Sequence, residues 1–160
     1  MLDQERIYSI LELLKLFDNS DKIASNLVQN FFRSRKHMGS KDRKFISSSF
    51  WNILRHRSKI GWHLTLLGIE ITNERELFLE LFFLNLRYKN NLIEIKKLLI
   101  LKFKDFMNIA EVDLHFLERL NIDRFYNNKM PEPIYYELPE YLITSVKKVS
   151  QMIGKKFYYH

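Results

Sequence analysis

The chain has 160 residues, a size that fits one compact domain, and 46% of them are hydrophobic, which is ordinary for a globular protein with a core. Its 26 Lys and Arg residues outnumber 19 Asp and Glu residues, and the net charge of +7 favours nucleic acid as a partner, ahead of an acidic membrane surface or an acidic protein. The absence of cysteine excludes disulfides, thiolate metal sites and cysteine nucleophiles, and is compatible with a reducing cytoplasm.

The sequence carries no recognisable signal for export or membrane insertion. Its first six residues are acidic and polar, whereas a secretory signal begins with basic and then apolar residues. The most apolar run, residues 77–86, is interrupted by Glu80 and Asn85 and is about half the roughly 20 residues that a membrane-spanning helix needs. We therefore expect a cytoplasmic protein in which this run forms a buried helix.

Apolar residues recur at helical spacing near the start of the chain and predict two amphipathic helices. The first stripe contains Ile7, Ile10, Leu11, Leu14 and Phe17, and the second contains Ile23, Leu27, Val28, Phe31 and Phe32. Residues 18–21 form a polar break that offers good helix N-cap residues. This pattern predicts a tight connection and an antiparallel hairpin.

A third helix is predicted from about Lys41 to Arg57, after a stop at Gly39, with Asp42 in its first turn where a negative charge suits the helix dipole. In a helix, one face would collect Phe45, Ile46, Phe50 and Ile53, and the opposite face would collect Lys41, Lys44, Ser48, Trp51 and Arg55. The sequence thus predicts a positive stripe beside an aromatic side chain.

Further helices are predicted in the second half of the chain. Beyond Gly61 we expect an apolar turn or two and a stop at Gly68, followed by helices at about 73–88, 92–103 and 112–120. No convincing period-2 run or hairpin turn is present, so the expected fold class is all-α.

All three prolines, Pro131, Pro133 and Pro139, fall near the C-terminus. They predict an extended rather than helical segment over residues 130–139, and Pro139 suits the first position of a short final helix that ends near Met152. We expect a helical domain over residues 1–128 and a connecting segment over residues 129–160.

The basic excess of the chain is concentrated in residues 33–59, which hold nine Lys or Arg residues and one acid, a local net charge of +8. Such a patch would neutralise phosphates and give salt-sensitive binding, and an exposed tryptophan would add stacking on an unpaired base. The candidate RNA-binding residues are Arg33, Arg35, Lys36, Lys41, Arg43, Lys44, Trp51, Arg55, Arg57 and Lys59. Two alternatives remain open: a charged face that is simply solvated, and a tryptophan packed at a helix edge.

Two separated strings carry a family resemblance. The first runs from Met38-Gly39-Ser40-Lys41-Asp42-Arg43-Lys44-Phe45-Ile46 through Phe50-Trp51-Asn52-Ile53-Leu54-Arg55-His56-Arg57 to Ile60-Gly61-Trp62, and the second comprises Met130-Pro131-Glu132 and Leu138-Pro139-Glu140-Tyr141-Leu142. Together they resemble the N-terminal NusB-like domain of the Fmu/Sun ribosomal RNA cytosine-C5 methyltransferases, and Phe31-Phe32-Arg33 upstream resembles the alphaproteobacterial variant of that domain. The resemblance implies a NusB-like helical bundle that binds ribosomal RNA ahead of a methyltransferase domain. It also implies that Lys41, Arg43, Arg55 and Arg57 face RNA, while Asp42 is a structural partner or cap.

No catalytic machinery is expected in this chain. The family reaction needs a cysteine thiolate and a Gly-rich turn for S-adenosylmethionine, and the sequence has neither, so we expect no cofactor here. The five histidines are scattered, which favours surface or interface positions over a metal site. Glu74, Glu76 and Glu80 are interpreted as a solvated acidic face rather than as paired catalytic carboxylates.

The predicted function is that of the RNA-binding domain of a ribosomal RNA (cytosine-C5) methyltransferase, which positions structured RNA on its basic helix hairpin. One alternative is a stand-alone NusB-type antitermination factor, although the Pro-containing exit after Met130 argues against it. Another alternative is a helical protein-interaction module in which helices 73–88 and 92–103 present a groove.

Overall fold

The computed structural model describes residues 3–86, 93–94, 97 and 126–157. Within these residues the chain contains helices and no strand, which confirms the predicted all-α class. The helices are α1 (Asp3–Asp18), α2 (Ala24–Arg33), α3 (Ser40–Leu66), α4 (Asn73–Leu86), α7 (Glu132–Tyr136) and α8 (Glu140–Phe157). Apart from residues 93–94 and 97, the helices predicted at 92–103 and 112–120 lie outside the described part of the chain.

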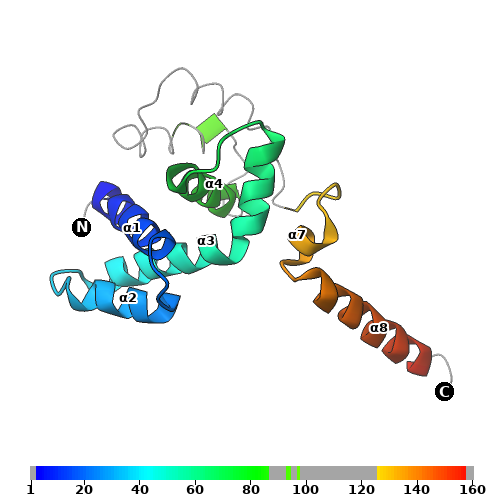
Figure 1. Ribbon diagram of the computed structural model, residues 1–160. Helices are drawn as coiled ribbons and strands as arrows, with labels where there is room; N and C mark the ends of the chain where they lie inside the picture. The colour runs from blue at the N-terminus through cyan, green and yellow to red at the C-terminus, as the bar shows by residue number, and fades with distance from the viewer. Residues whose placement is uncertain (1–2, 87–92, 95–96, 98–125, 158–160) are drawn as a thin grey trace.

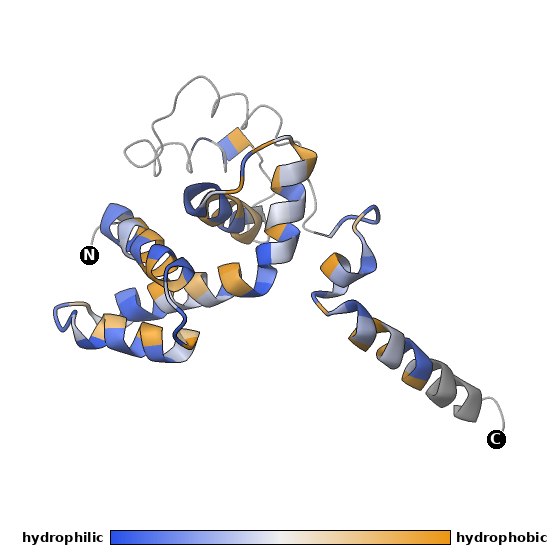
Figure 2. Ribbon diagram, in the orientation of Figure 1, coloured by the Kyte–Doolittle hydropathy of each residue, from blue (hydrophilic) through white to orange (hydrophobic). Residues whose placement is uncertain are grey.

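Helices α1 and α2 form the expected hairpin, in which α2 runs back beneath α1 (Figure 1). Both helices turn their apolar residues toward α3, so the stripes predicted from the sequence meet in one core (Figure 2). The polar break does not cap α2 with a side chain, because the N-cap residue is Ile23 and it makes no side-chain cap hydrogen bond. Packing of Leu27, Val28 and Phe31 into the core therefore holds α2 in place.

Helix α3 is longer than predicted, since it continues through Gly61 to Leu66. The buried stripe also continues, with Ile60 and Leu64 both fully buried, and this packing offsets the roughly 1 kcal/mol that a mid-helix glycine costs. The helix is terminated after Leu66 by Gly68, the residue that follows the C-cap and has φ +70°. There the Gly68 and Ile69 amides donate to the Thr65 and Leu64 carbonyls at 2.9 Å, the two hydrogen bonds of a Schellman motif.

Helix α4 is buried on nearly every side, as the apolar run at 77–86 predicts. Six of its apolar side chains are 6% exposed or less: Leu77, Phe78, Leu79, Leu81, Phe82 and Phe83. The helix packs against both α1 and α3 and lies behind them in Figure 1. Among the described helices, none is both long enough and apolar enough to cross a bilayer.

The prediction that residues 130–139 are extended is wrong over Glu132–Tyr136, which form the single-turn helix α7. The prolines permit this helix because Pro131 is its N-cap and Pro133 lies in its first turn, where the missing amide proton has no helical acceptor. Helix α7 ends at Tyr136, and its C-cap residue Glu137 has a left-handed backbone (φ 55°) that terminates the turn. The final helix then begins directly after Pro139, close to the predicted position.

The C-terminal segment is anchored to the bundle through α7. Helix α7 packs against α3 on one side and α8 on the other, whereas α8 projects away from the bundle (Figure 1). Met130, just before α7, and Ile143, in the first turn of α8, are 6% and 5% exposed, so this segment buries apolar side chains on both sides of α7. The segment expected to be a connector is thus docked on α3.

Candidate nucleic-acid interface

The helical phase predicted for α3 is confirmed by the burial of its side chains. Ile46, Phe50 and Ile53 are fully buried, and Phe45 is half-buried against the same core. On the opposite face, the exposed side chains are Lys41, Lys44, Ser48, Trp51 and Arg55. We call these five residues the basic stripe. Its members follow one another at intervals of three or four residues and therefore lie along one line of the helix surface.

Trp51, in the basic stripe, is partly packed against the core and partly exposed. Its side chain is 37% exposed, and its ring meets the ring of buried Phe50 edge-on, with centroids 5.4 Å apart and an interplanar angle of 69°. Contact with Phe50 restrains the indole while part of its surface remains open to solvent. Trp51 thus combines packing at a helix edge with a surface on which a base can stack.

Two further exposed cations, Arg33 and Lys36, lie at the end of α2 and in the turn that leads to α3. Arg43 holds this turn against α3, because its guanidinium donates to the carbonyls of Met38 at 2.9 Å, Arg35 at 3.3 Å and Lys36 at 3.4 Å. Arg43 was predicted to bind RNA, but its guanidinium is occupied by these backbone contacts.

Arg35 is also engaged within the protein. Its guanidinium lies over the Phe31 ring, 3.8 Å from the centroid, and pairs with the Glu12 carboxylate of α1. The cation–π contact and the ion pair together connect the end of α2 to α1. Like Arg43, Arg35 stabilises the helix hairpin that carries the exposed cations.

Arg57 is the centre of a polar network that joins three helices. Its guanidinium makes a two-point contact with Asp18 at the end of α1, with N–O distances of 2.7 and 3.1 Å. Its Nε donates to both oxygens of Glu76 at 2.8 and 3.1 Å, and a terminal nitrogen donates to Asn73 at 3.1 Å. The hydrogen bonds from Arg57 lower the pKa of Asp18, and those to Asp18 and Glu76 raise the pKa of Arg57. This arginine is therefore committed to the fold rather than to an external ligand.

Lys59 follows Arg55 by one helical turn and so continues the line of the basic stripe, yet it is only 1% exposed. The segment that contains α7 covers it: the carboxylate of Glu137, the C-cap residue of α7, is 3.1 Å from the Lys59 ammonium, and the ring centroid of Tyr126, which precedes α7, is 4.1 Å away. The 3.1 Å contact is close enough for an ion pair, but its geometry makes no hydrogen bond to Glu137 Oε1. Lys59 is inaccessible to an external phosphate while α7 is docked.

Several polar residues of the interior differ from the sequence-based expectation. The acidic face expected on α4 is not solvated, because Glu76 and Glu80 are 1% and 4% exposed. Two histidines are also buried rather than on the surface: His63 at 1% and His56 at 9%, where Nδ1 of His56 lies 3.2 Å from Glu80. Both histidines lie three or four residues from Ile53 or Ile60 and so share the apolar face of the helix, and this spacing in the sequence could have predicted their burial.

Asp42 has the structural role expected of it, since it pairs with Arg6 of α1 at 2.7 Å. Within the described segments, no three His, Asp or Glu side chains come together in a way that could hold a metal ion.

Of the ten candidate RNA-binding residues, six remain exposed: Arg33, Lys36, Lys41, Lys44, Trp51 and Arg55. We call these six residues the basic face.

Comparisons with models of protein families, with curated proteins and with solved structures found no match.

Proposed function

We propose that this chain is an RNA-binding domain that holds structured RNA on its basic face. The observation that carries the proposal is that some cations of residues 33–59 are paired within the protein and others are not. Internal contacts occupy Arg35, Arg43, Arg57 and Lys59. None of the five cations of the basic face forms an ion pair with a residue that the structure describes. Exposed cations without protein partners can neutralise phosphates at no cost in broken ion pairs.

The family resemblance extends this proposal to a particular setting, the N-terminal domain of a ribosomal RNA (cytosine-C5) methyltransferase. The cofactor of that reaction does not fit the described residues: Gly39, Gly61 and Gly68 are isolated from one another, and no strand precedes any of them between residues 3 and 86. The proposal therefore assigns catalysis and S-adenosylmethionine binding to a separate domain. A gene that continues past His160 into a Gly-rich strand–turn–helix and a Pro-Cys pair would support it.

A protein-interaction module receives less support from the packing. That alternative needs the apolar side chains of helix 73–88 on the surface, but those of α4 are used in the core, where Phe78 and Phe82 are at most 1% exposed. A stand-alone antitermination factor would use the same basic face. It would differ from the methyltransferase domain in needing no C-terminal connection.

Binding to RNA across a salt series tests the proposal with the variant Lys41→Ala/Lys44→Ala/Arg55→Ala. Each lost phosphate contact is expected to reduce the slope of log K against log salt by about 0.7–0.9, so the triple variant should lose about two units or more. Affinity at low salt should fall together with the slope, because the stripe supplies electrostatic contacts.

The matched control is Lys22→Ala/Lys97→Ala/Lys148→Ala, which removes the same charge from exposed lysines outside the basic face. The control should retain a larger part of both affinity and salt slope than the stripe variant. Equal losses in the two variants would show that net charge alone governs binding, and the basic face would then have no special role.

A further inference from the structure

A pocket lies beside α7, at the point where the line of the basic stripe reaches the C-terminal segment. Its volume is about 750 Å³, within the roughly 300–1,000 Å³ of typical small-ligand sites. We call it the tyrosine pocket, and its main lining residues are Tyr126, Asn127, Asn128, Glu132, Tyr135 and Tyr136.

The three tyrosines form a restrained aromatic cluster. Tyr135 meets both neighbours edge-on, with centroid distances of 5.4 Å to Tyr126 and 5.1 Å to Tyr136. Tyr126 and Tyr136 are nevertheless 50% and 53% exposed, so ring surface remains available in the pocket. Rings held by mutual packing bind a planar ligand at a low cost in side-chain entropy.

The polar residues of the pocket suit a neutral ligand with a hydrogen-bonding edge. Both oxygens of Glu132 are 2.6 Å from the Lys147 ammonium, so the charge of this carboxylate is already compensated. Asn127 accepts the Lys129 amide proton at 2.9 Å and fixes the turn, whereas Asn128 is exposed. An amide side chain can donate and accept at once, as the edge of a nucleobase requires.

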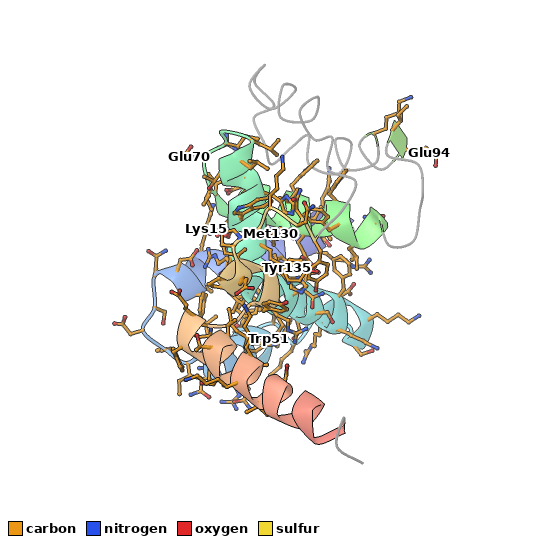
Figure 3. The ribbon with its side chains drawn as sticks, turned by 90° about the vertical axis from the view of Figure 1, so that its right-hand side faces the viewer. Lys15, Trp51, Glu70, Glu94, Met130 and Tyr135 are labelled. Atoms are coloured by element: carbon orange, nitrogen blue, oxygen red, sulfur yellow. The ribbon has the colours of Figure 1, made fainter. Side chains whose placement is uncertain are left out.

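The position of the pocket connects it to the basic stripe. Tyr126 lies over the Lys59 ammonium at 4.1 Å, and Lys59 follows Arg55 by four residues, about 6 Å along the helix axis. Figure 3 looks onto this side of the molecule, with Tyr135 and Met130 of the C-terminal segment above Trp51. Phosphates on the stripe would bring the neighbouring nucleotides to the mouth of the tyrosine pocket.

We propose that the tyrosine pocket binds one unpaired nucleobase of the RNA that the basic stripe holds. The base stacks on the exposed tyrosine rings, and its edge pairs with the Asn128 amide. Stacking is tolerant of base identity, so the pocket selects for an unpaired nucleotide more than for a sequence. This inference rests on the proposed RNA-binding function and adds the requirement that the bound RNA contain an unpaired nucleotide.

Two RNA hairpins of equal length test it, one fully paired and one with a single bulged 2-aminopurine, titrated with the full chain. The bulged hairpin should bind more tightly, and stacking should quench the 2-aminopurine fluorescence. Tyr136→Ala should reduce affinity for the bulged hairpin by about 5- to 150-fold, the range for loss of one base–aromatic stack, and should abolish the quenching. Affinity for the paired hairpin should be unchanged.

Three further variants separate stacking from loss of structure. Tyr136→Phe retains the ring and should retain the quenching, whereas Asn128→Ala, in an exposed turn, should weaken only the bulged hairpin. Tyr141→Ala removes a tyrosine that is 71% exposed on α8, outside the pocket, and should match the wild type. Equal salt-sensitive binding of both hairpins would overturn the pocket proposal alone, and no binding of either hairpin would overturn the proposed function as well.

Discussion

Arg57 and Asp18 lie 39 positions apart in the sequence and meet in a two-point contact, with N–O distances of 2.7 and 3.1 Å. Through this contact the last residue of α1 is joined to the middle of α3, and the same guanidinium reaches Glu76 of α4. The planar fork of arginine allows such simultaneous pairing, which the single ammonium of a lysine cannot reproduce.

Removing this arginine should destabilise the domain. Arg57→Ala leaves the carboxylate of Glu76, whose side chain is 2% exposed, without its cation. We expect a loss of about 2–3 kcal/mol, below the roughly 3–5 kcal/mol of a fully buried pair because a third of the Arg57 side chain is solvent-screened. Urea unfolding followed by circular dichroism measures the change. Arg55→Ala, two positions earlier and exposed, is the control and should alter stability by no more than about 0.5 kcal/mol.

The Arg57–Asp18 contact should also make stability depend on pH. The Asp18 pKa in the folded protein is lowered from its ordinary value of 3.8 by the hydrogen bond from Arg57. A lowered folded-state pKa stabilises the protein fully above the unfolded value, and the stabilisation is lost as pH falls below 3.8 through the folded value. Melting temperatures should be measured from pH 6 to pH 2 for the wild type and for Asp18→Asn. The melting temperature of Asp18→Asn should decline less steeply at the acidic end than that of the wild type, because the variant has no carboxylate at this position to protonate. Parallel curves for both proteins would contradict the assignment.

The Lys59–Glu137 ion pair should control the docking of the C-terminal segment. Lys59→Met keeps the aliphatic bulk but leaves Glu137, which has a left-handed backbone, without its countercharge. We expect faster hydrogen exchange of the amides of α7, while exchange in α1 and α2 stays unchanged. Lys147→Met, which removes the exposed pair with Glu132, should have a much smaller effect on α7. Unchanged exchange in α7 of the Lys59 variant would mean that apolar contacts alone anchor the segment.

Neighbouring aromatic residues of α3 should respond differently to truncation. Phe50 is fully buried and meets the Phe17 ring edge-on with centroids 5.8 Å apart. Phe50→Ala should cost about 3–5 kcal/mol, the usual range for a large core aromatic. Trp51→Ala should cost less, because 37% of this side chain is already exposed. Thermal or urea unfolding of the two variants compares them, and equal losses would contradict the burial difference between the two faces of α3.

Local patterns predicted the class of the fold and the orientation of its helices. The spacing of Ile46, Phe50 and Ile53 was sufficient to define the buried face of α3 and, by exclusion, the exposed stripe. The apolar run of α4 predicted its burial in the same way. Where a local signal competed with packing, packing prevailed: α3 passes through Gly61 because Ile60 and Leu64 continue the core.

The charge count could not distinguish cations that serve the fold from cations that face solvent. Arg55 and Arg57 are two residues apart and identical in type, yet Arg55 is exposed and Arg57 is enclosed by Asp18 and Glu76. Lys59 lies on the same line as Arg55 and is buried only because α7 covers it.

The sequence by itself determined the presence of helices α1 to α4 and α8, the amphipathic phase of α3 and the concentration of positive charge, because these depend on residues within a few turns of one another. Only the tertiary structure decided which of those charges remain exposed, since their partners come from α1, α4 and the C-cap of α7, up to 78 positions away at Glu137. Such pairings follow from how the helices pack, and helix packing depends on contacts between distant residues rather than on any local pattern.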